Sequence, residues 1–367
     1  IYTLSDTLSL HDALPIYCLE AAPNVELVAM GDLFPERLER CRQQLTKKLG
    51  DKVKVTDEMC FTGWDAYKKV LATDVNLVIL TAPPYFRPAH LRAAIEAGKH
   101  VFAEKPVAVD PVGVRSVIES SRLADEKGLT IVAGTQGRRM AHLIEGMKRI
   151  HNGDMGEIVG GQCVRIGDGM LTWSETTRQR QPGWSDMEWQ LRRSLFLTWL
   201  SGDFIVEMHV HNLDRVNWAM NAHPVQCTGL GGRQARTGPE YGNCYDHFAV
   251  EYEYPNGARI EYLGAQIDKA TYRQSYQIVG TKGLAYTDSG NFIIKGEKPF
   301  TYDGPQPSPV IQQHADQIAA IRSGQRLNEG VRVAESTLTC IMGRMSAYTG
   351  RALKWDWAMQ ASKLDLR

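Results

Sequence analysis

A lysine at the end of a short apolar run is the first residue whose position suits catalysis. Lys105 lies in the segment Lys99–Pro106, which reads KHVFAEKP. A lysine at the carboxyl end of a strand can donate a hydrogen bond to a substrate hydroxyl or carbonyl oxygen. Glu104 can orient this lysine, and Pro106 fixes the backbone directly after it. The alternative interpretation is a surface Glu-Lys pair, which is common in proteins.

A second group of polar residues lies in the segment Gly202–Asp214, which reads GDFIVEMHVHNLD. We predict a helix that begins near Phe204. Glu207, His211 and Asp214 then share one face of the helix, at spacings of i, i+4 and i+7. An imidazole on such a face can act as a general acid or base, with Glu207 or Asp214 orienting it. The segment therefore predicts a catalytic histidine at His211.

His209 belongs to the same segment but points about 200° away from Glu207 on the predicted helix. Two histidines with nearby acids are also typical of zinc or manganese sites. The pattern His-x-His suits a metal best on a strand, where both side chains share a face, so we expect no metal here. Two interpretations of His209 stay open: a histidine packed behind the site, and a direct contact to substrate.

The N-terminal half of the chain alternates short apolar runs with periodic, charged segments. Near-continuous apolar strands separated by helices are typical of a parallel sheet covered on both faces. We therefore predict a Rossmann-type, doubly wound α/β domain over residues 1–135, with ligands at the carboxyl ends of its strands. The predicted strands are Val25–Met30, Val53–Val55, Val75–Leu80, His100–Ala103 and Thr130–Ala133.

Residues at the carboxyl ends of these strands predict a dinucleotide site. Asp32 can accept hydrogen bonds from an adenosine ribose 2′-OH and would repel a 2′-phosphate, which favours NAD over NADP. A helix N-cap or a turn aspartate is the alternative role for Asp32. The accompanying motif GxGxxG is missing, and the first glycine of the chain is Gly31. The other candidate cofactor residues are Thr81, Pro83, Pro84, Glu104, Lys105 and Gln136.

Residues 1–16 differ from the buried strand and glycine-rich turn that such a domain predicts at this place. They read IYTLSDTLSLHDALPI and contain no glycine. The segment looks like translated sequencing-adapter sequence, a contaminant of assembled metagenomic reads, and we expect it not to be native. The alternative is a genuine first strand near Thr7–Leu10. No signal peptide is recognisable, so a cytoplasmic and a periplasmic location both stay open.

The composition changes after Gln136, and residues 136–367 are predicted to form an α+β domain that binds substrate. Alternating runs over Asp246–Tyr254 and Ala258–Ala265 flank Pro-Asn-Gly, a strong hairpin signal. We predict a large, mostly antiparallel open sheet, followed by helices over Val310–Ser323 and Val331–Tyr348.

Tryptophans and arginines crowd a long polar stretch before the histidine segment, and indole faces with guanidinium donors suit sugar rings. A later loop is rich in Gly, Arg and Tyr. The alternative for each of these side chains is packing or an oligomer contact. The candidate substrate residues are Trp184, Arg192, His209, Arg236 and Tyr241.

The overall composition excludes several functional classes. The 367 residues include 42 Lys and Arg and 42 Asp and Glu, so the net charge is zero. Nucleic-acid binders usually carry a basic excess. No run approaches the 18 apolar residues of a membrane span, and the seven cysteines form no CxxC pair. We therefore expect a small-molecule partner, with no nucleic acid and no membrane.

Taken together, the strand ending at Asp32, the turn Thr81–Pro84, the EKP segment and the histidine segment resemble the Gfo/Idh/MocA oxidoreductase family. The resemblance runs from about residue 18 to the end of the chain. It implies that Lys105 lies near the nicotinamide, and that Glu207 and His211 match the family's acid and its histidine near the reacting carbon. It also implies a homo-oligomer, a dimer or tetramer, formed through the open sheet.

From these features we predict an NAD-dependent oxidoreductase that transfers hydride between a hydroxyl-bearing carbon of a sugar, polyol or glycoside and nicotinamide. Whether Lys105 or His211 is the base stays open. The alternative enzyme is an NAD-dependent glycosidase that works by transient oxidation at C3 and elimination. A third class is a relative without catalysis, against which the presence of Lys105, Glu207 and His211 together argues.

Overall fold

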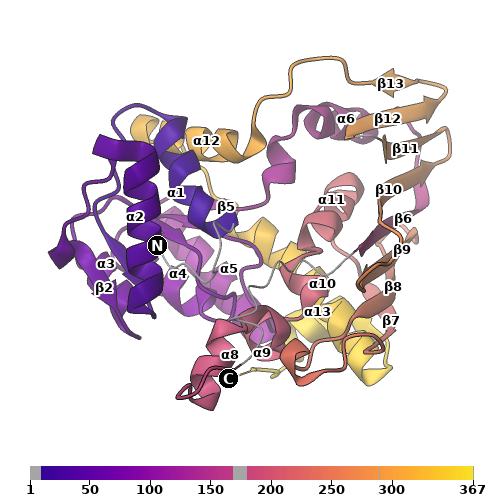
Figure 1. Ribbon diagram of the computed structural model, residues 1–367. Helices are drawn as coiled ribbons and strands as arrows, with labels where there is room; N and C mark the ends of the chain where they lie inside the picture. The colour runs from indigo at the N-terminus through magenta and orange to yellow at the C-terminus, as the bar shows by residue number, and fades with distance from the viewer. Residues whose placement is uncertain (1–9, 168–179, 289, 367) are drawn as a thin grey trace.

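A parallel α/β region and a large sheet lie on opposite sides of the molecule, with helices between them (Figure 1). The computed structural model describes residues 10–167, 180–288 and 290–366. The predicted fold class, a Rossmann-type region followed by a mostly antiparallel sheet, is confirmed.

The strands of the α/β region are parallel but form two separate sheets. One sheet pairs β1 (Met30–Asp32) with β2 (Cys60–Thr62), and the other has the order β3 (Leu77–Leu80), β4 (His100–Ala103), β5 (Ile131–Ala133). The helices of this region are α1 (Leu10–Ala21), α2 (Pro35–Leu49), α3 (Ala66–Leu71), α4 (Arg87–Glu96) and α5 (Pro111–Glu126).

Two predicted strands are shorter than expected. Val25–Met30 contributes one isolated bridge, from Leu27 to Val53, before β1 begins at Met30, and Val53–Val55 contributes only the other end of that bridge. The strand β2, which the sequence analysis missed, pairs with β1 instead. Regular pairing is limited here because β1 has a strand neighbour on one side only.

Residues 10–16 form the first turns of α1, so the alternative of a strand that ends at Leu10 is wrong at that residue; Thr7 to Ser9 lie outside the described residues. Leu14 packs with Phe102 and Ile318, and Ile16 packs in a second apolar cluster with residues of α2. Both side chains are buried. The end of the unusual segment therefore contributes to the core of the α/β region.

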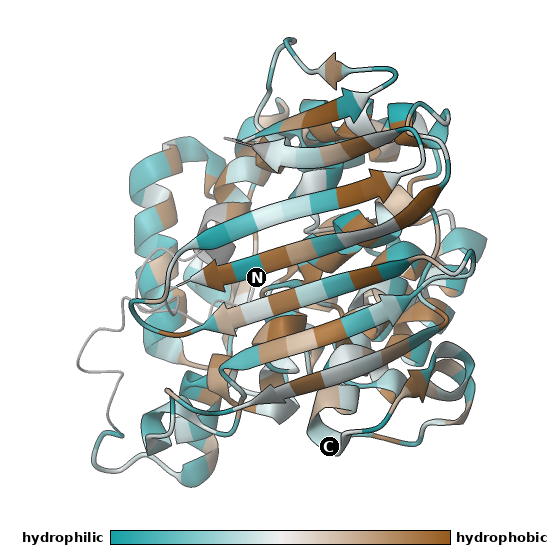
Figure 2. Cartoon of the chain, turned by 90° about the vertical axis from the view of Figure 1, so that its right-hand side faces the viewer, coloured by the Kyte–Doolittle hydropathy of each residue, from teal (hydrophilic) through white to brown (hydrophobic). Residues whose placement is uncertain are grey.

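The second region contains a nine-stranded sheet in the order β13-β12-β11-β10-β6-β9-β8-β7-β14. Only β6 and β9, in the middle, run parallel to each other. Figure 2 shows the outer face of this sheet, where apolar and polar residues are interspersed. The strands are β6 (Ile158–Gly167), β7 (Gln226–Gly232), β8 (His247–Glu253), β9 (Arg259–Gln266), β10 (Arg273–Gly280), β11 (Gly283–Asp288), β12 (Asn291–Gly296), β13 (Phe300–Thr301) and β14 (Leu353–Lys354).

Helices connect the two regions and build the core between them. The longest, α13 (Gly330–Thr349), packs against α5 on one side and β7 on the other. Helix α12 (Pro309–Ser323) returns to the α/β region and packs on α1 (Figure 1). The remaining helices are α6 (Ala141–His151), α8 (Asp186–Arg192), α9 (Thr198–Ser201), α10 (Phe204–Glu207) and α11 (Val210–Met220).

The predicted single helix from Phe204 is wrong, because α10 ends at Glu207 and α11 begins at Val210. Arg165 on β6 donates a hydrogen bond of 2.8 Å to the carbonyl oxygen of Met208, at the break between the two helices. A side chain that binds a backbone carbonyl in this way competes with the regular helical hydrogen bond. The contact comes from a distant strand, so helical periodicity could not reveal it.

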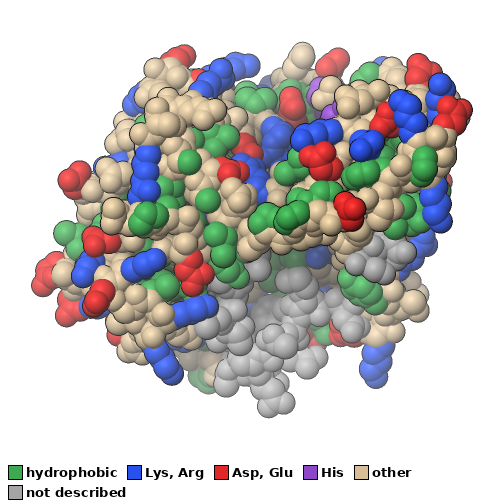
Figure 3. Space-filling view, turned by 90° about the horizontal axis from the view of Figure 1, so that it is seen from above, with side chains coloured by type: hydrophobic (Ala, Val, Ile, Leu, Met, Phe, Trp, Pro, Cys, Tyr) green, Lys and Arg blue, Asp and Glu red, His purple; other side chains and the backbone are tan. Residues whose placement is uncertain are grey.

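Acidic and basic side chains are interspersed on the face seen from above, in agreement with the net charge of zero (Figure 3). In the described part of the chain, no helix is both long enough and apolar enough to cross a bilayer.

Candidate functional site

The structure brings Lys105 and Glu207 together where the two regions meet. Lys105 follows β4, and Glu207 is the last residue of α10. The Lys105 Nζ donates a hydrogen bond of 2.6 Å to the Glu207 carbonyl oxygen and lies 3.7 Å from the carboxylate atom Oε1. Both side chains are buried, with about 5% of their surface exposed. The pair therefore places a cation and an acid at the carboxyl edge of the parallel strands.

Burial and nearby charges act on the pKa of the Glu207 carboxyl group in opposite directions. Burial raises its pKa, whereas the positive charges of Lys105 and Arg87 act in the other direction. The oxygen Oε2 is buried and has no hydrogen-bond partner among the described residues. A buried oxygen without a partner is unfavourable, so this atom is a ready acceptor for a substrate hydroxyl.

Glu104 contacts the backbone of Lys105 rather than its ammonium group. Its Oε2 accepts a hydrogen bond of 3.1 Å from the Lys105 backbone N–H. A Cβ atom at Gly134 would lie 2.3 Å from the Glu104 Oε1, so the close approach of β4 and the loop after β5 requires glycine there. Burial raises the pKa of Glu104, and the charges of Lys105 and Arg87 oppose this. Glu104 therefore fixes the backbone from which Lys105 projects.

Arg87, which the sequence analysis missed, joins two loops of the candidate site. Its guanidinium donates to the carbonyl oxygen of Pro106 and to that of Ala82. The peptide between Lys105 and Pro106 is cis, and Arg87 is fully buried beneath it. Its position at the start of α4, directly after Tyr85 and Phe86, carries no sequence signal, because the role depends on the meeting of two strand ends.

His211 lies in the first turn of α11 and is partly exposed. Burial lowers its pKa well below the usual value, and the positive charges of Lys105, Arg215 and Arg165 lower it further. The imidazole is therefore neutral at pH 7 and able to accept a proton.

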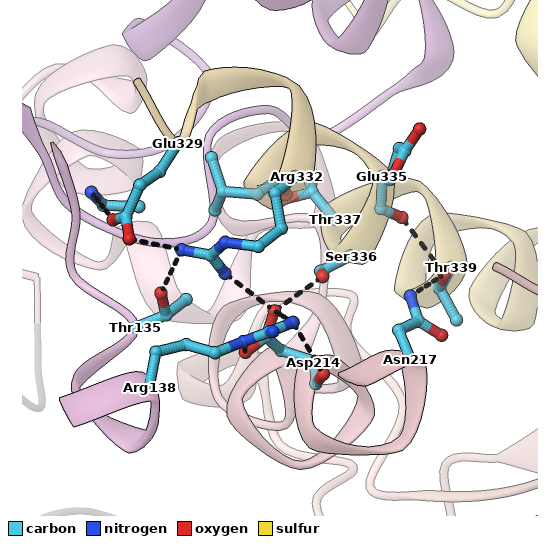
Figure 4. Close-up of polar contacts among 12 residues, drawn as sticks. Thr135, Arg138, Asp214, Asn217, Glu329, Arg332, Glu335, Ser336, Thr337 and Thr339 are labelled. Atoms are coloured by element: carbon cyan, nitrogen blue, oxygen red, sulfur yellow. Dashed lines mark hydrogen bonds and ion pairs between the residues drawn. The ribbon is translucent and has the colours of Figure 1, made fainter. Parts of the chain in front are cut away.

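Asp214 does not orient His211, because other groups occupy its carboxylate. Arg138 and Arg332 both reach Asp214, and Ser336 donates to the same oxygen (Figure 4). Burial alone would raise the pKa of Asp214, but the two arginines outweigh it and hold the pKa well below the usual range. Arg332 also contacts Thr135 after β5, so this network joins the two regions.

His209 is buried among core side chains. Its Nδ1 is hydrogen-bonded to the Tyr262 hydroxyl on β9, and its ring packs against Phe204. Burial lowers the pKa of His209 well below the usual value. The structure therefore matches the interpretation of a packed histidine rather than a substrate contact. The described residues contain no group of three potential metal-ligating side chains.

The candidate cofactor residues lie at the carboxyl ends of the parallel strands. The turn Thr81–Pro84 is buried after β3, and the Thr81 hydroxyl has no partner among the described residues. Gln136 begins a short 3₁₀ helix after β5 and is partly exposed. Asp32 is buried and accepts a hydrogen bond of 2.8 Å from the Phe34 N–H, a turn contact; the N-cap of α2 is Phe34, not Asp32.

Two of the candidate substrate residues lie on the Asp32 side. Arg192 forms an ion pair of 2.7 Å with Glu36 in the first turn of α2. Its guanidinium lies 3.9 Å from the centre of the Phe34 ring and 4.7 Å from that of Trp184. The arrangement places Trp184 and Arg192 beside the start of α2.

The other two, Arg236 and Tyr241, line a cavity of about 20 Å³ together with Glu207. The loop that carries them is held by Asp246, whose Oδ2 accepts hydrogen bonds of 2.6–2.9 Å from three successive backbone N–H groups. The Arg236 guanidinium lies 5.4 Å from the centre of the Tyr241 ring and forms an ion pair with Asp268. A cavity of this size holds about one water molecule.

Asp203 is a further residue that the sequence analysis missed. It has φ of 79° and precedes α10, where its carboxylate accepts hydrogen bonds from the Tyr245 N–H (2.9 Å) and the Tyr348 hydroxyl (2.6 Å). Burial raises the pKa of Asp203 to about 6. Its position after Gly202 was a turn signal, but only the fold shows that it fixes the start of the helix that carries Glu207.

Comparison with known families identifies both regions. Residues 15–135 match the Gfo/Idh/MocA family described as "Oxidoreductase family, NAD-binding Rossmann fold", and residues 147–286 match the Gfo/Idh/MocA C-terminal domain. The N-terminal match begins inside α1, near the end of the unusual first segment.

Several characterised proteins are similar in sequence. The chain is 29% identical over 230 residues to 2,7-anhydro-N-acetylneuraminate hydratase of Escherichia coli K12, covering 61% of this chain and 55% of the hydratase. It is 23% identical to glycosyl hydrolase family 109 protein 4 of Phocaeicola vulgatus, covering 78% of this chain and 55% of that protein. The chain thus spans about half the length of these relatives.

Solved structures share the fold over nearly the whole chain. Aldose-aldose oxidoreductase from Caulobacter crescentus has a TM-score of 0.71 at 18% identity, with 95% of this chain and 96% of that chain covered. Myo-inositol 2-dehydrogenase from Lactobacillus plantarum has a TM-score of 0.70 at 18% identity, with 96% and 97% covered. With both of its domains matched, the chain belongs to the Gfo/Idh/MocA oxidoreductase family.

Proposed function

We propose that this protein is an NAD-dependent oxidoreductase that transfers hydride between a hydroxyl-bearing carbon of a sugar, polyol or glycoside and nicotinamide. The observation that carries this proposal is the buried Lys105–Glu207 pair, beside the Thr81 turn and an inner cavity lined by Arg236. A fixed cation, an acid and a cavity together suit the binding of a hydroxyl group whose proton must leave.

The residues at the strand ends fit a nicotinamide dinucleotide. The buried Thr81 hydroxyl lacks a partner among the described residues, and Lys105 lies at the end of the adjacent strand β4. Asp32, at the end of β1, favours NAD over NADP because its carboxylate would repel a 2′-phosphate. When bound, the dinucleotide supplies the hydride acceptor or donor.

Residues of this chain can bind the substrate hydroxyl group and accept its proton. The Lys105 ammonium has three N–H groups, one of which the Glu207 carbonyl oxygen accepts at 2.6 Å. A substrate oxygen that accepts a hydrogen bond from a second of these N–H groups is polarised and held in place. Neutral His211 then accepts the hydroxyl proton as hydride leaves the carbon, and buried Glu207 fixes the lysine. Lys105 as the base is the alternative assignment.

Small carbohydrate-like molecules are the proposed substrates. Tyr241 and Arg236 offer a ring face and guanidinium donors beside Glu207. The relatives include an inositol 2-dehydrogenase of Rhizobium meliloti, 20% identical over 266 residues. A homo-oligomer formed through the open sheet is part of the proposal, because Leu230 on β7 and Tyr272, directly before β10, are 71% and 73% exposed.

A first experiment tests the cofactor. The purified chain is denatured, and any released dinucleotide is identified by mass spectrometry. NAD or NADH is the expected finding, and NADP would contradict the assignment of Asp32. Purified chain is then incubated with NAD and a panel of aldoses, inositols and glycosides. Substrate-dependent formation of NADH supports net oxidation. If dinucleotide-loaded protein forms no NADH with any compound of the panel, net oxidation is contradicted.

A redox-neutral reaction is the second candidate, because a hydratase and a family 109 glycosyl hydrolase are among the similar proteins. In such a reaction a carbon is oxidised, a leaving group departs by elimination, and the hydride returns. Release of the aglycone from an aryl glycoside without accumulation of NADH would favour this candidate. Accumulation of NADH in step with substrate loss would exclude it.

A further inference from the structure

Two arginines beside His211 lack an acidic partner. Arg215 lies one helical turn after His211 on α11, so the two side chains share a face of the helix. Arg165 on β6 donates to the Met208 carbonyl oxygen and lies 3.3 Å from the Asn212 Oδ1 atom, in the segment that carries His211. Neither guanidinium forms an ion pair with a carboxylate in the described part of the chain.

The Arg215 guanidinium has five N–H groups and few acceptors for them. Its Nη2 atom contacts the Met140 Sδ atom at 3.7 Å, and a thioether sulfur is a weak acceptor. Its Nε atom is buried and has no hydrogen-bond partner among the described residues. A Cβ atom at Gly137 would lie 3.0 Å from this Nε atom, so the guanidinium lies against the short helix that begins with Gln136. Since a buried donor without a partner is unfavourable, Arg215 can bind an acceptor that the chain does not supply.

The acids around these arginines are already occupied. Glu207 pairs with Lys105, and Asp214 is held by two other arginines. Burial lowers the pKa of Arg165 and that of Arg215, because each cation loses contact with water. Two positive charges therefore lie beside the site without a counter-charge from the described residues.

A ligand with a negative charge would supply what these two cations lack. Buried charges in proteins are normally paired, and guanidinium groups bind carboxylate and phosphate oxygens through parallel N–H donors. Besides burial, the charges of both arginines lower the pKa of His211, so they act where the substrate hydroxyl group is expected. Side chains at i and i+4 of a helix are about 5–6 Å apart at Cβ. An anionic group bound by Arg215 and a hydroxyl group at His211 therefore fit one small molecule.

We propose that the substrate of this site is an acidic carbohydrate, whose carboxylate or phosphate group is bound by Arg215 and Arg165. The inference rests on the proposed function, because it takes the reacting hydroxyl group to lie at Lys105 and His211. It narrows the substrate class from sugars, polyols and glycosides in general to those with an anionic group a few carbon atoms from the reacting carbon. Arg215 and Arg165 are then specificity-determining residues.

The test measures binding instead of turnover, so it does not require the proposed reaction. Isothermal titration on the whole chain, with and without NAD, compares matched pairs of compounds: D-glucuronate with D-glucose, D-galacturonate with D-galactose, and D-glucose 6-phosphate with D-glucose. At least one acid should bind about tenfold or more tightly than its neutral partner, which is the gain expected from a hydrogen bond to a charged group. The preferred acid then distinguishes a carboxylate ligand from a phosphate ligand.

Variants of Arg215 test which residue provides the preference. Arg215→Gln removes the charge and should abolish most of the preference for the acid, whereas Arg215→Lys keeps the charge and should retain part of it. Arg92→Gln is the control and should leave the preference unchanged, because Arg92 lies on the surface of α4 and pairs with Glu96. Without ligand, the thermal unfolding midpoint of Arg215→Gln should rise, because the variant no longer buries a cation without a counter-charge.

Equal affinity for acids and neutral sugars, binding of no acid, or a preference that Arg215→Gln leaves unchanged would each overturn the proposal. A fall in the unfolding midpoint of Arg215→Gln would also overturn it, because the guanidinium would then be satisfied within the protein. Weaker binding of NAD by Arg215→Gln, with unchanged binding of the acids, would assign the arginine to the cofactor instead. If neutral sugars are oxidised and acids show no advantage, the proposed oxidoreductase activity stands and only the substrate class is wrong.

Discussion

The Nζ atom of Lys105 lies 2.6 Å from the carbonyl oxygen of Glu207 and 3.7 Å from its carboxylate, although 102 residues separate them in sequence. Lys105 belongs to the parallel α/β region and Glu207 to the short helix α10 beside the large sheet. The contact therefore joins the proposed cofactor side of the protein to its proposed substrate side. It is the central feature on which the expected effects of substitutions depend.

Replacing the lysine should remove activity without unfolding the protein. Lys105→Ala deletes the proposed donor to the substrate oxygen, and we expect the turnover number to fall by about 10²–10⁴-fold. Lys68→Ala is the matched control, because Lys68 is exposed and pairs only with Asp65 among the described residues. Steady-state kinetics on the substrate found by screening measures both. Equal turnover in the two variants would contradict the role of Lys105.

A methyl group at Gly134 should displace Lys105 through its contact with Glu104. In Gly134→Ala the new Cβ overlaps the buried Glu104 carboxylate, which must move and displace the Lys105 backbone that it holds. We expect turnover to fall at least tenfold. Gly167→Ala is the control, because its Cβ would meet only the side chain of exposed Tyr272 among the described residues. Circular dichroism should show that both variants fold, and unchanged turnover in Gly134→Ala would refute the positioning by Glu104.

The network around Asp214 should matter for stability rather than for proton transfer. Asp214→Asn leaves Arg138 and Arg332 without their buried carboxylate, which costs about 3 kcal/mol or more in the free energy of unfolding. The exposed ion pair of Asp65 with Lys68 provides the control. Asp65→Asn should change the free energy of unfolding by less than about 1 kcal/mol. Urea denaturation at pH 7 measures both. Equal effects would show that Asp214 does not hold the two regions together.

Buried His314 should destabilise the protein in acid. Its ring stacks on Phe102, neither nitrogen has a partner among the described residues, and burial lowers its pKa to about 3. Between this value and about 6.5 only the unfolded chain binds the proton, so stability falls as the pH falls through 6.5. His314→Phe removes this effect, and its stabilisation relative to the unaltered chain should be about 2 kcal/mol larger at pH 5 than at pH 8.

Urea denaturation at both pH values tests this prediction. A stabilisation by His314→Phe that does not depend on pH would show that the buried ring is not the acid-sensitive group.

The contact of Arg192 with α2 should affect cofactor binding more than turnover. Arg192→Ala removes the ion pair to Glu36 and the stacking on Phe34, both next to Asp32. We expect the dissociation constant for NAD to rise by about 5- to 30-fold, with little change in turnover at saturating NAD. Arg180→Ala, at a more exposed pair with Asp186, should leave both quantities unchanged. Isothermal titration measures the dissociation constant for NAD, and steady-state kinetics measures turnover and KM. A role of Arg192 in substrate binding would instead raise KM for the sugar.

Local patterns predicted most elements well. Strand β4 has the predicted bounds, and helices α12 and α13 agree with the predicted ranges to within one residue at each end. These signals are carried by neighbouring residues, so they can be read without knowing the fold. The same holds for Lys105, because the end of an apolar run in a parallel sheet is also the edge at which ligands bind.

Contacts between distant segments decided the rest. Periodicity along Gly202–Asp214 predicted one helix, but Arg165 on a separate strand binds at the break and His209 turns into the core. The tryptophan and arginine of the stretch around Trp184 had the right chemistry for a sugar, yet Arg192 contacts Phe34 and Glu36 at the start of α2.

Spacing within a few residues was enough to predict the parallel α/β region, the open antiparallel sheet and the strand end that carries Lys105. The contact of Glu207 with Lys105 and the contacts of Arg138 and Arg332 with Asp214 are visible only in the folded chain. Each of these depends on long-range packing, since burial and hydrogen bonding select partners in space rather than in sequence.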